Sequence, residues 1–236
     1  MSSRELPAVM SSQEPRSVTL RRPPGPRRIA AILAGYRSDE ACAREHLDDP
    51  SPTVRAAALG ALARSNHMDL MDLNRGFTDQ DPQVRRRTCE IAARRSRFAG
   101  REHDKRALAA EIVHLLEDPD DLVCESAAWA LGELCENRSS ASTVALDVLE
   151  ALHAVACNHR SPLCREAAVA ALGTIGDPKT LASIIQALSD RPQVRRRAVV
   201  ALAAFDHPDA EAAMKSCLAD RDWQVRQSAE ELLALD

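Results

Sequence analysis

The sequence predicts an all-α solenoid, a stack of about six helical hairpins. One observation is that the hexapeptide Pro-Gln-Val-Arg-Arg-Arg occurs twice, at Pro82–Arg87 and at Pro192–Arg197. Another is that a Val-Arg-like pair marks the same frame six times, at spacings of 30, 39, 41, 30 and 31 residues. Repeats of this length are typical of helical units that bury their apolar faces only by stacking on one another. These anchor pairs are Val54-Arg55, Val84-Arg85, Val123-Cys124, Cys164-Arg165, Val194-Arg195 and Val225-Arg226.

A helix start is expected just before each anchor pair. Proline stands two residues before the anchor in four of the six copies, and a Ser or Asp precedes that position in every copy except at Arg191. A short polar side chain accepts a hydrogen bond from a free backbone N–H at a helix start, and proline at the first helical position sacrifices no bond. The sequence therefore predicts six helices that begin with a polar cap, with Arg191 as the exception.

Each of these helices carries one apolar face. Apolar or small residues occupy the anchor and the positions four, seven and eight residues beyond it, as in Val194, Ala198, Ala201 and Leu202. This spacing places them on one side of a helix. Because alanine dominates the face, we expect neighbouring helices to approach closely.

A second set of helices is expected between the anchor helices. No segment shows the alternating pattern of a strand, so helix pairs joined by short turns account for the whole repeat region, residues 27–236. The proline-rich and basic residues 1–26 show no helical period, and we expect them to form a disordered arm. The expected second helices are Met68–Phe77, Arg106–Leu116, Ser142–Cys157, Thr180–Leu188 and Asp209–Leu218, after a lead-in at Ile29–Tyr36 and Glu40–Leu47.

The repeat motif also carries a family resemblance. Asp-x-x-Pro-x-Val-Arg-x-x-Ala followed by Ala-Leu-Gly resembles the short HEAT-like repeat of the bilin-lyase (PBS lyase) type, over roughly Asp49 to Asp236. The resemblance implies a ladder of Asp–Arg ion pairs between neighbouring repeats. His159, Ser189 and Cys124 depart from the motif, so we expect the ladder to be interrupted in the third to fifth repeats. The matching residues are Asp49, Asp79, Asp118 and Asp220 with Arg55, Arg85, Arg165, Arg195 and Arg226.

Composition and charge limit the function classes. The chain is 45% hydrophobic but only 3% aromatic, and its net charge of −4 is unevenly distributed. Residues 85–106 hold nine Lys or Arg against three Asp or Glu, whereas residues 107–160 hold two against ten. Such blocks favour charge-steered association at separate patches, although solvated helix faces that merely cluster charge remain an alternative. No segment has the length of a membrane span or the pattern of a signal peptide, so we expect a cytoplasmic protein without membrane contact.

One cluster of His and Cys residues is a candidate metal site. The seven cysteines form no Cys-x-x-Cys pair, but His153, Cys157, His159 and Cys164 lie within twelve residues. These residue types can hold zinc tetrahedrally. However, their spacing matches no standard zinc module, and Cys164 occupies an anchor position that should face inward. We therefore expect no metal and no cofactor.

Catalysis has no support in the motifs. Iron-dependent hydroxylases built from similar repeats carry His-Glu dipeptides after the anchor, and this chain contains none. It also lacks a Gly-rich phosphate loop and a Gly-x-Ser-x-Gly nucleophile motif. Bilin attachment is named in the family that the repeats resemble, yet no residue pattern here specifies a tetrapyrrole site. We expect a non-catalytic protein.

A binding surface is expected on the side of the anchor helices that faces away from their core. The side chains two and six residues beyond each anchor face this side. In HEAT-like stacks, which the repeats resemble, this side is the concave surface. The second position reads Ala56, Arg86, Glu125, Glu166, Arg196 and Gln227, and this change of sign argues against a continuous phosphate track.

These positions predict a protein-binding scaffold. Its expected partner is another protein with an acidic segment, because guanidinium groups bind carboxylates bidentately. Two alternatives stay open: a nucleic-acid binder that uses residues 85–106 and the basic arm, and an accessory subunit of a lyase or other enzyme. The expected contact residues are Arg86, Arg87, Trp129, Arg196 and Arg197.

Overall fold

The computed structural model describes residues 25–99, 102–135 and 146–234. The arm expected at residues 1–26 lies almost wholly outside these ranges, as does the start of the helix expected at Ser142–Cys157. Within the described residues the chain is all α-helical, and no strand occurs.

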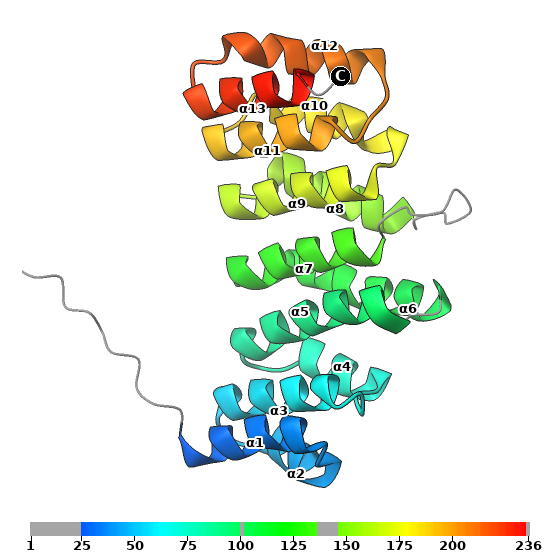
Figure 1. Ribbon diagram of the computed structural model, residues 1–236, viewed down its shortest axis with the longest axis vertical. Helices are drawn as coiled ribbons and strands as arrows, with labels where there is room; N and C mark the ends of the chain where they lie inside the picture. The colour runs from blue at the N-terminus through cyan, green and yellow to red at the C-terminus, as the bar shows by residue number, and fades with distance from the viewer. Residues whose placement is uncertain (1–24, 100–101, 136–145, 235–236) are drawn as a thin grey trace, which may run out of the picture.

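The helices form two layers that run the length of a stack (Figure 1). Each helix of the first layer packs against the next one in that layer. The first layer comprises α1 (Pro26–Arg37), α3 (Pro52–Arg64), α5 (Pro82–Ala99), α7 (Asp121–Leu134), α9 (Pro162–Ile175), α11 (Pro192–Leu202) and α13 (Trp223–Leu233).

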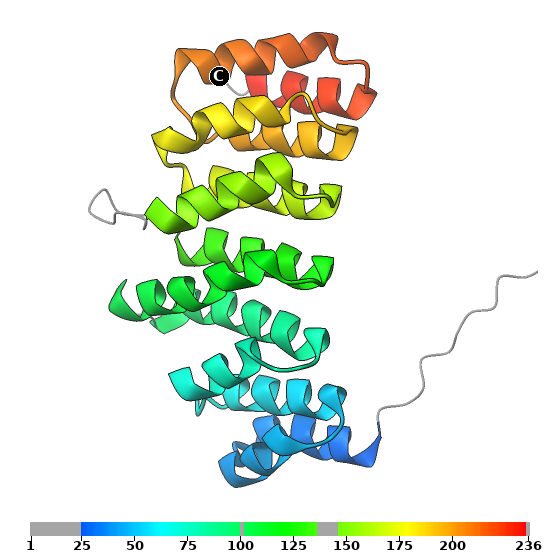
Figure 2. The same cartoon turned by 180° about the vertical axis from the view of Figure 1, so that it is seen from behind.

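Figure 2 shows the molecule from behind, with the second layer toward the viewer. Its helices alternate with those of the first layer along the chain, so that α1 to α12 make six hairpins in the described residues and α13 follows them. The second layer comprises α2 (Glu40–Glu45), α4 (Leu70–Phe77), α6 (Glu102–Val113), α8 (Leu146–Asn158), α10 (Leu181–Ala187) and α12 (Pro208–Ser216), with short 3₁₀ turns at His46–Asp48, His114–Glu117, Pro178–Thr180 and Cys217–Ala219. The predicted all-α solenoid of about six hairpins is confirmed.

The expected helix caps are only partly correct. Asp81, Asp120 and Asp222 each accept a hydrogen bond from a backbone N–H of the helix that follows. Ser51 and Ser161 make no such side-chain bond, and the Ser51 hydroxyl instead lies 3.0 Å from the Thr53 hydroxyl. Asp81 caps a helix that also begins with proline, so proline at the first position does not decide whether the side-chain cap forms.

The alanine-rich faces bring the first-layer helices into close contact. Val194, Ala198, Ala201 and Leu202 are all buried. One close approach is at Gly173 of α9, where an added Cβ would lie 2.6 Å from the Ala201 Cβ and 2.9 Å from the Ala201 Cα of α11. Small side chains at this crossing therefore set the spacing between repeats.

Candidate protein-binding face

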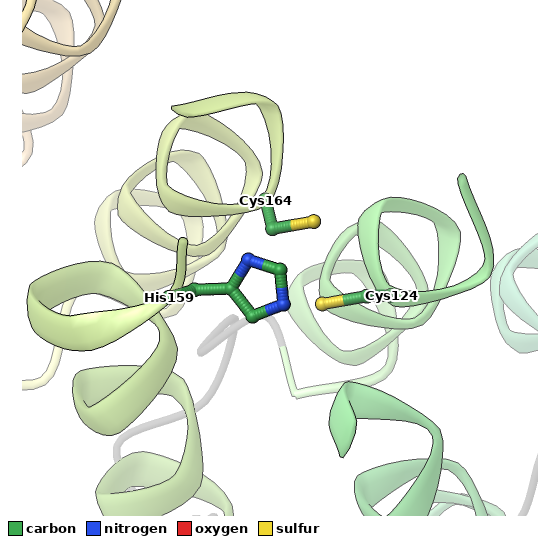
Figure 3. Close-up of side chains that lie close together, drawn as sticks. All are labelled: Cys124, His159 and Cys164. Carbon is green, nitrogen blue, oxygen red and sulfur yellow. The ribbon is translucent and has the colours of Figure 1, made fainter. Parts of the chain in front are cut away.

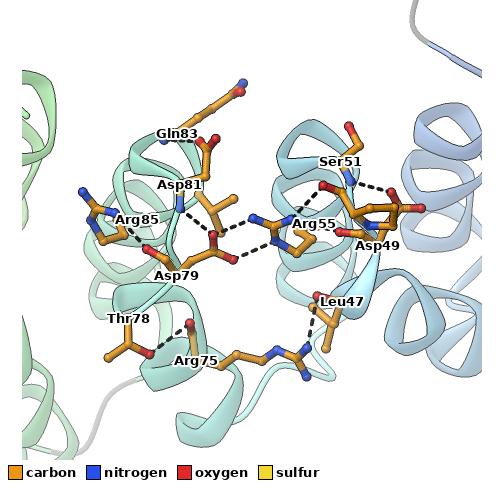
Figure 4. Close-up of polar contacts among 12 residues, drawn as sticks. Leu47, Asp49, Ser51, Arg55, Arg75, Thr78, Asp79, Asp81, Gln83 and Arg85 are labelled. Carbon is orange, nitrogen blue, oxygen red and sulfur yellow. Dashed lines mark hydrogen bonds and ion pairs between the residues drawn. The ribbon is translucent and has the colours of Figure 1, made fainter.

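A ladder of ion pairs fixes the orientation of one repeat relative to the next. In each rung an arginine near the start of a first-layer helix binds both carboxylate oxygens of an aspartate in the loop before the next first-layer helix, at 2.6–2.8 Å. Three of these aspartates, Asp79, Asp118 and Asp220, belong to the predicted set, and Figure 4 shows the first rung. The rungs are Arg55–Asp79, Arg85–Asp118, Arg165–Asp190 and Arg195–Asp220.

The same arginines also fix their own repeats. Arg55 donates to the Asp49 carbonyl oxygen at 2.9 Å, and Arg85 donates to the Asp79 carbonyl oxygen at 2.8 Å. Arg165, Arg195 and Arg226 make the equivalent bonds to the loops that precede them, to His159, Asp190 and Asp220 respectively. Each guanidinium of a rung therefore joins its own loop to the loop of the following repeat.

The pairing perturbs both partners. Hydrogen bonds from Arg165 and Arg195 lower the pKa of Asp190 and Asp220 respectively. At Asp79 burial opposes ionisation, but the hydrogen bonds from Arg55 and from the Asp81 backbone outweigh it and lower the pKa. In return, the aspartates raise the pKa of the Arg55, Arg165 and Arg195 side chains. The ladder aspartates with lowered pKa are thus ionised partners at neutral pH.

The expected interruption of the ladder is wrong in extent. Ser189 takes no part, but its neighbour Asp190 accepts both bonds from Arg165, because the loop places a carboxylate one residue later. Only the junction between α7 and α9 lacks an Arg–Asp rung among the described first-layer junctions from α3 to α13. There the two motif positions hold Cys124 and His159. At the first junction Asp49 is paired with Arg27 of α1, at 3.0 Å.

The four-residue cluster considered for metal binding divides in the structure. His153 Nδ1 lies 2.6 Å from the Ser183 hydroxyl, and Cys157 Sγ lies 3.6 Å from both His153 Nδ1 and Gln186 Oε1. His159 and Cys164 instead lie beside Cys124 (Figure 3). Sequence reasoning noticed Cys124 only as a departure from the ladder, because it is far along the chain from the other two.

The first-layer face carries a basic hollow over α1, α3 and α5. It has a volume of about 290 Å³ and is lined by Arg28, Arg64, Arg86 and Arg87, with Glu90 as its only acidic residue. Arg87 binds Glu90 at 2.7 Å, whereas Arg86 lies farther from it, at 3.7 Å. Arg86 Nε is buried and has no hydrogen-bond partner among the described residues. This hollow therefore keeps an excess of positive charge.

A second hollow on the same face has the opposite charge. It lies over α7, α9 and α11, has a volume of about 230 Å³, and contains Glu125, Glu133, Glu166, Arg197 and Trp129. Trp129 is 38% exposed, which is unusual for so large an apolar side chain. Burial raises the pKa of Glu125, although Arg86 acts in the opposite direction. Arg197 is 3.4 Å from Glu166, which leaves the hollow acidic overall.

Four of the five predicted contact residues line the two hollows. Arg86 and Arg87 line the basic hollow, and Trp129 and Arg197 line the acidic one. Arg196 lines neither of these two hollows and donates to the Gln224 side chain at 3.2 Å. The expected contact residues include neither Arg28 nor Arg64, because neither occupies an anchor-helix position that recurs from repeat to repeat.

Comparison with known families and structures identifies the repeats. A model of HEAT repeats matches residues 149–234, and a HEAT repeat model matches residues 109–138. Together with the motif and the stacked hairpins, these matches define the class as a HEAT-type α-solenoid. The chain is a HEAT-like repeat protein. No curated protein sequence matches it significantly.

Solved structures resemble the chain in fold. YibA of Escherichia coli is 18% identical with a TM-score of 0.61, covering 91% of this chain and 77% of that one. The CpcE–CpcF complex of phycocyanin lyase from Nostoc sp. PCC7120 is 20% identical with a TM-score of 0.53, covering 82% and 75%. A designed armadillo repeat protein in complex with the peptide (KR)4 is 16% identical with a TM-score of 0.58, covering 81% and 97%. At these identities the likeness concerns the fold alone. None of the described helices is both long and apolar enough to span a bilayer.

Proposed function

We propose that this protein is a non-catalytic scaffold that binds an extended segment of another protein along its first-layer face. The observation that carries the proposal is the pair of oppositely charged hollows on that one face. They are lined by successive first-layer helices, α1 to α5 and α7 to α11, so a single extended chain can follow one into the other.

The basic hollow selects carboxylates. Guanidinium groups bind carboxylates through paired hydrogen bonds, and the Arg86 side chain in this hollow is 41% exposed. The acidic segment of the partner therefore lies over α1, α3 and α5.

The acidic hollow selects a lysine or arginine. An exposed indole attracts a cation over its face, and Glu125 and Glu166 supply neutralising charge beside Trp129. A designed repeat protein of related fold is itself solved with a charged peptide, (KR)4, and this likeness favours peptide binding by a helical stack. The partner segment is therefore of mixed charge, and it extends the acidic segment expected from the sequence.

The two rival functions have weaker support. A nucleic-acid binder requires a row of cations, and the three glutamates over α7 and α9 interrupt it. A role beside a lyase rests on the fold likeness to the CpcE–CpcF complex, and none of the described hollows carries a residue pattern specific for a tetrapyrrole.

The test is fluorescence anisotropy with labelled probe peptides. One peptide joins a Glu-rich half to a Lys-rich half, and two others carry only one of these halves. We expect the mixed peptide to bind at least tenfold more tightly than either half, since linking two modules raises the effective concentration of the second. Arg86→Glu with Arg87→Glu should weaken the acidic half, and Glu125→Lys with Glu166→Lys should weaken the basic half.

A matched control is Arg37→Glu with Lys179→Glu, which also replaces two cations and lines neither hollow. It should bind the mixed peptide like the wild type. Equal binding of all three peptides, or the same loss in the control, contradicts the proposal. Tighter binding of labelled DNA, with an affinity that falls steeply with salt, favours the nucleic-acid rival.

A further inference from the structure

The junction between α7 and α9 keeps the geometry of the ladder but changes its side chains. Where the other junctions hold an arginine, α7 holds Cys124, and where they hold a loop aspartate, this loop holds His159. Cys164 adds a second sulfur from the first turn of α9. Figure 3 shows the three side chains converging from two helices and the loop between α8 and α9.

The three donors are close enough for one ion. The Sγ atoms of Cys124 and Cys164 and one ring nitrogen of His159 all lie within 4.8 Å of one another. In a tetrahedral zinc site with Zn–S of about 2.3 Å and Zn–N of about 2.0 Å, ligand atoms lie about 3.5–3.8 Å apart. Small side-chain rotations therefore bring the donors to bonding distance.

The loop holds His159 in place. Its Nδ1 accepts a hydrogen bond from the Ser161 N–H at 3.1 Å, as the Asp79 and Asp118 side chains do from the residues two positions later. In Figure 3 the ring nitrogen farther from the backbone, Nε2, points toward Cys124. The imidazole thus occupies the place of a ladder carboxylate, with its outer nitrogen directed at the thiol that replaces the arginine.

Both thiols are buried near a helix start, where a bound cation favours the thiolate form. They are fully buried, and burial raises the pKa of Cys124 and Cys164, so each is a neutral thiol without a nearby cation. Each sits in the first turn of its helix, where the backbone N–H groups favour a thiolate. Two buried thiols and an imidazole are a donor set that prefers zinc or another thiophilic cation.

We propose that Cys124, His159 and Cys164 form a zinc site that replaces the missing ion pair and links the third repeat to the fourth. Binding releases two thiol protons to solvent and forms two Zn–S bonds and one Zn–N bond, without electron transfer. The neutral imidazole keeps one proton, which moves from Nε2 to Nδ1, and the bond from the Ser161 N–H is lost. Deprotonation of Cys164 also ends the hydrogen bond that its thiol donates to the Asp121 carbonyl oxygen.

A fourth coordination position remains for water. His159 also lines a hollow of about 470 Å³ between the second-layer helices, together with Arg160 and residues of α8 and the 3₁₀ turn at His114–Glu117. This hollow brings solvent to the His159 side of the site, and neither cysteine lines it. Three protein ligands and an accessible fourth position define the expected site.

The test is metal titration of the reduced, chelator-treated full chain. Zn²⁺ should bind at one equivalent per chain, and Co²⁺ should give the visible absorption of a tetrahedral thiolate complex. At zinc a hundredfold above its Kd, the Tm should rise by roughly 5–10 °C. Cys124→Ser with Cys164→Ser should weaken binding at least a hundredfold.

Two further variants keep the result interpretable if the double serine variant folds poorly. Cys124→Arg with His159→Asp installs the rung found at the other junctions, and it should fold, fail to bind Co²⁺ and gain no Tm from zinc. His153→Gln with Cys157→Ser removes the neighbouring His–Cys pair and should bind like the wild type. The proposal is overturned if the reduced wild type gives no thiolate spectrum, if binding follows His153 and Cys157, or if mass spectrometry of protein purified without reductant finds a Cys124–Cys164 disulfide in place of zinc.

Discussion

Two neighbouring junctions of the stack, α5 with α7 and α7 with α9, share a backbone but differ in chemistry. At the first, Arg85 binds both oxygens of Asp118, and the Asp120 N–H donates to Asp118. At the second, Cys124 faces His159, and the Ser161 N–H donates to the His159 ring in the same way. The loop geometry therefore does not depend on which side chains form the contact. The repeat places one side chain near the start of a first-layer helix beside another in the loop before the next first-layer helix. The residue types at these two positions determine whether an ion pair forms.

The difference is also electrostatic. At the α5–α7 junction each buried charge is neutralised by the other. The Arg85 side chain is 14% exposed and the Asp118 side chain is 5% exposed. The α7–α9 junction holds thiols that are neutral without a cation, because burial raises the pKa of both. Removing one partner should consequently have unequal effects at the two junctions.

The largest expected effect is the loss of one arginine. Arg85→Ala leaves Asp118 buried without its partner, which typically costs about 3–5 kcal/mol of unfolding free energy. Cys124→Ala in metal-free protein removes only a small buried thiol, and about 1 kcal/mol is expected. Urea unfolding followed by far-ultraviolet circular dichroism measures both. Equal losses would mean that the ion pair contributes no more than ordinary packing.

A smaller effect is expected in acid. The pKa values of Asp79, Asp190 and Asp220 are lowered in the folded chain, so their contribution to stability is complete above the unfolded-state value of about 3.9. It is lost as the pH falls below this value through the lower folded pKa, because the unfolded chain then binds more protons. Tm measured between about pH 6 and pH 2 should therefore fall most steeply below about pH 4.

Asp220→Asn is the matched control for the acid effect. It removes one titrating rung and keeps a side chain of similar size, so its Tm at neutral pH should be lower and its decline below about pH 4 shallower than in the wild type. Parallel curves for the variant and the wild type would show that Asp220 does not titrate differently in the folded and unfolded chains.

Much of the fold follows from the repeat frame in the sequence. Pro52, Pro82, Pro162 and Pro192 each begin an α-helix, as their position before the anchor predicts. The Ser51 and Ser161 caps did not form, since a residue type favoured at helix starts does not by itself ensure the side-chain bond.

The contacts of the candidate sites were harder to predict from the sequence than the helices were. Asp190 was overlooked because a loop that shifts a carboxylate by one residue breaks the motif but not the contact. Cys124 joins His159 and Cys164 only through the stacking of two repeats. Arg28 and Arg64 reach the basic hollow from outside the recurring positions. These contacts arise from packing between repeats, which a single-repeat pattern does not encode.

The most direct test of peptide binding along the first-layer face uses Trp129 as the reporter. The chain has two tryptophans, so Trp223→Phe leaves Trp129 alone, and Trp129→Phe leaves Trp223 as the matched control. Titration with the mixed-charge peptide should shift the Trp129 emission and protect it from a soluble quencher, with the same Kd as the anisotropy measurement. Trp223 should not respond. Tight peptide binding that leaves Trp129 unchanged, or that alters Trp223 instead, would contradict the account.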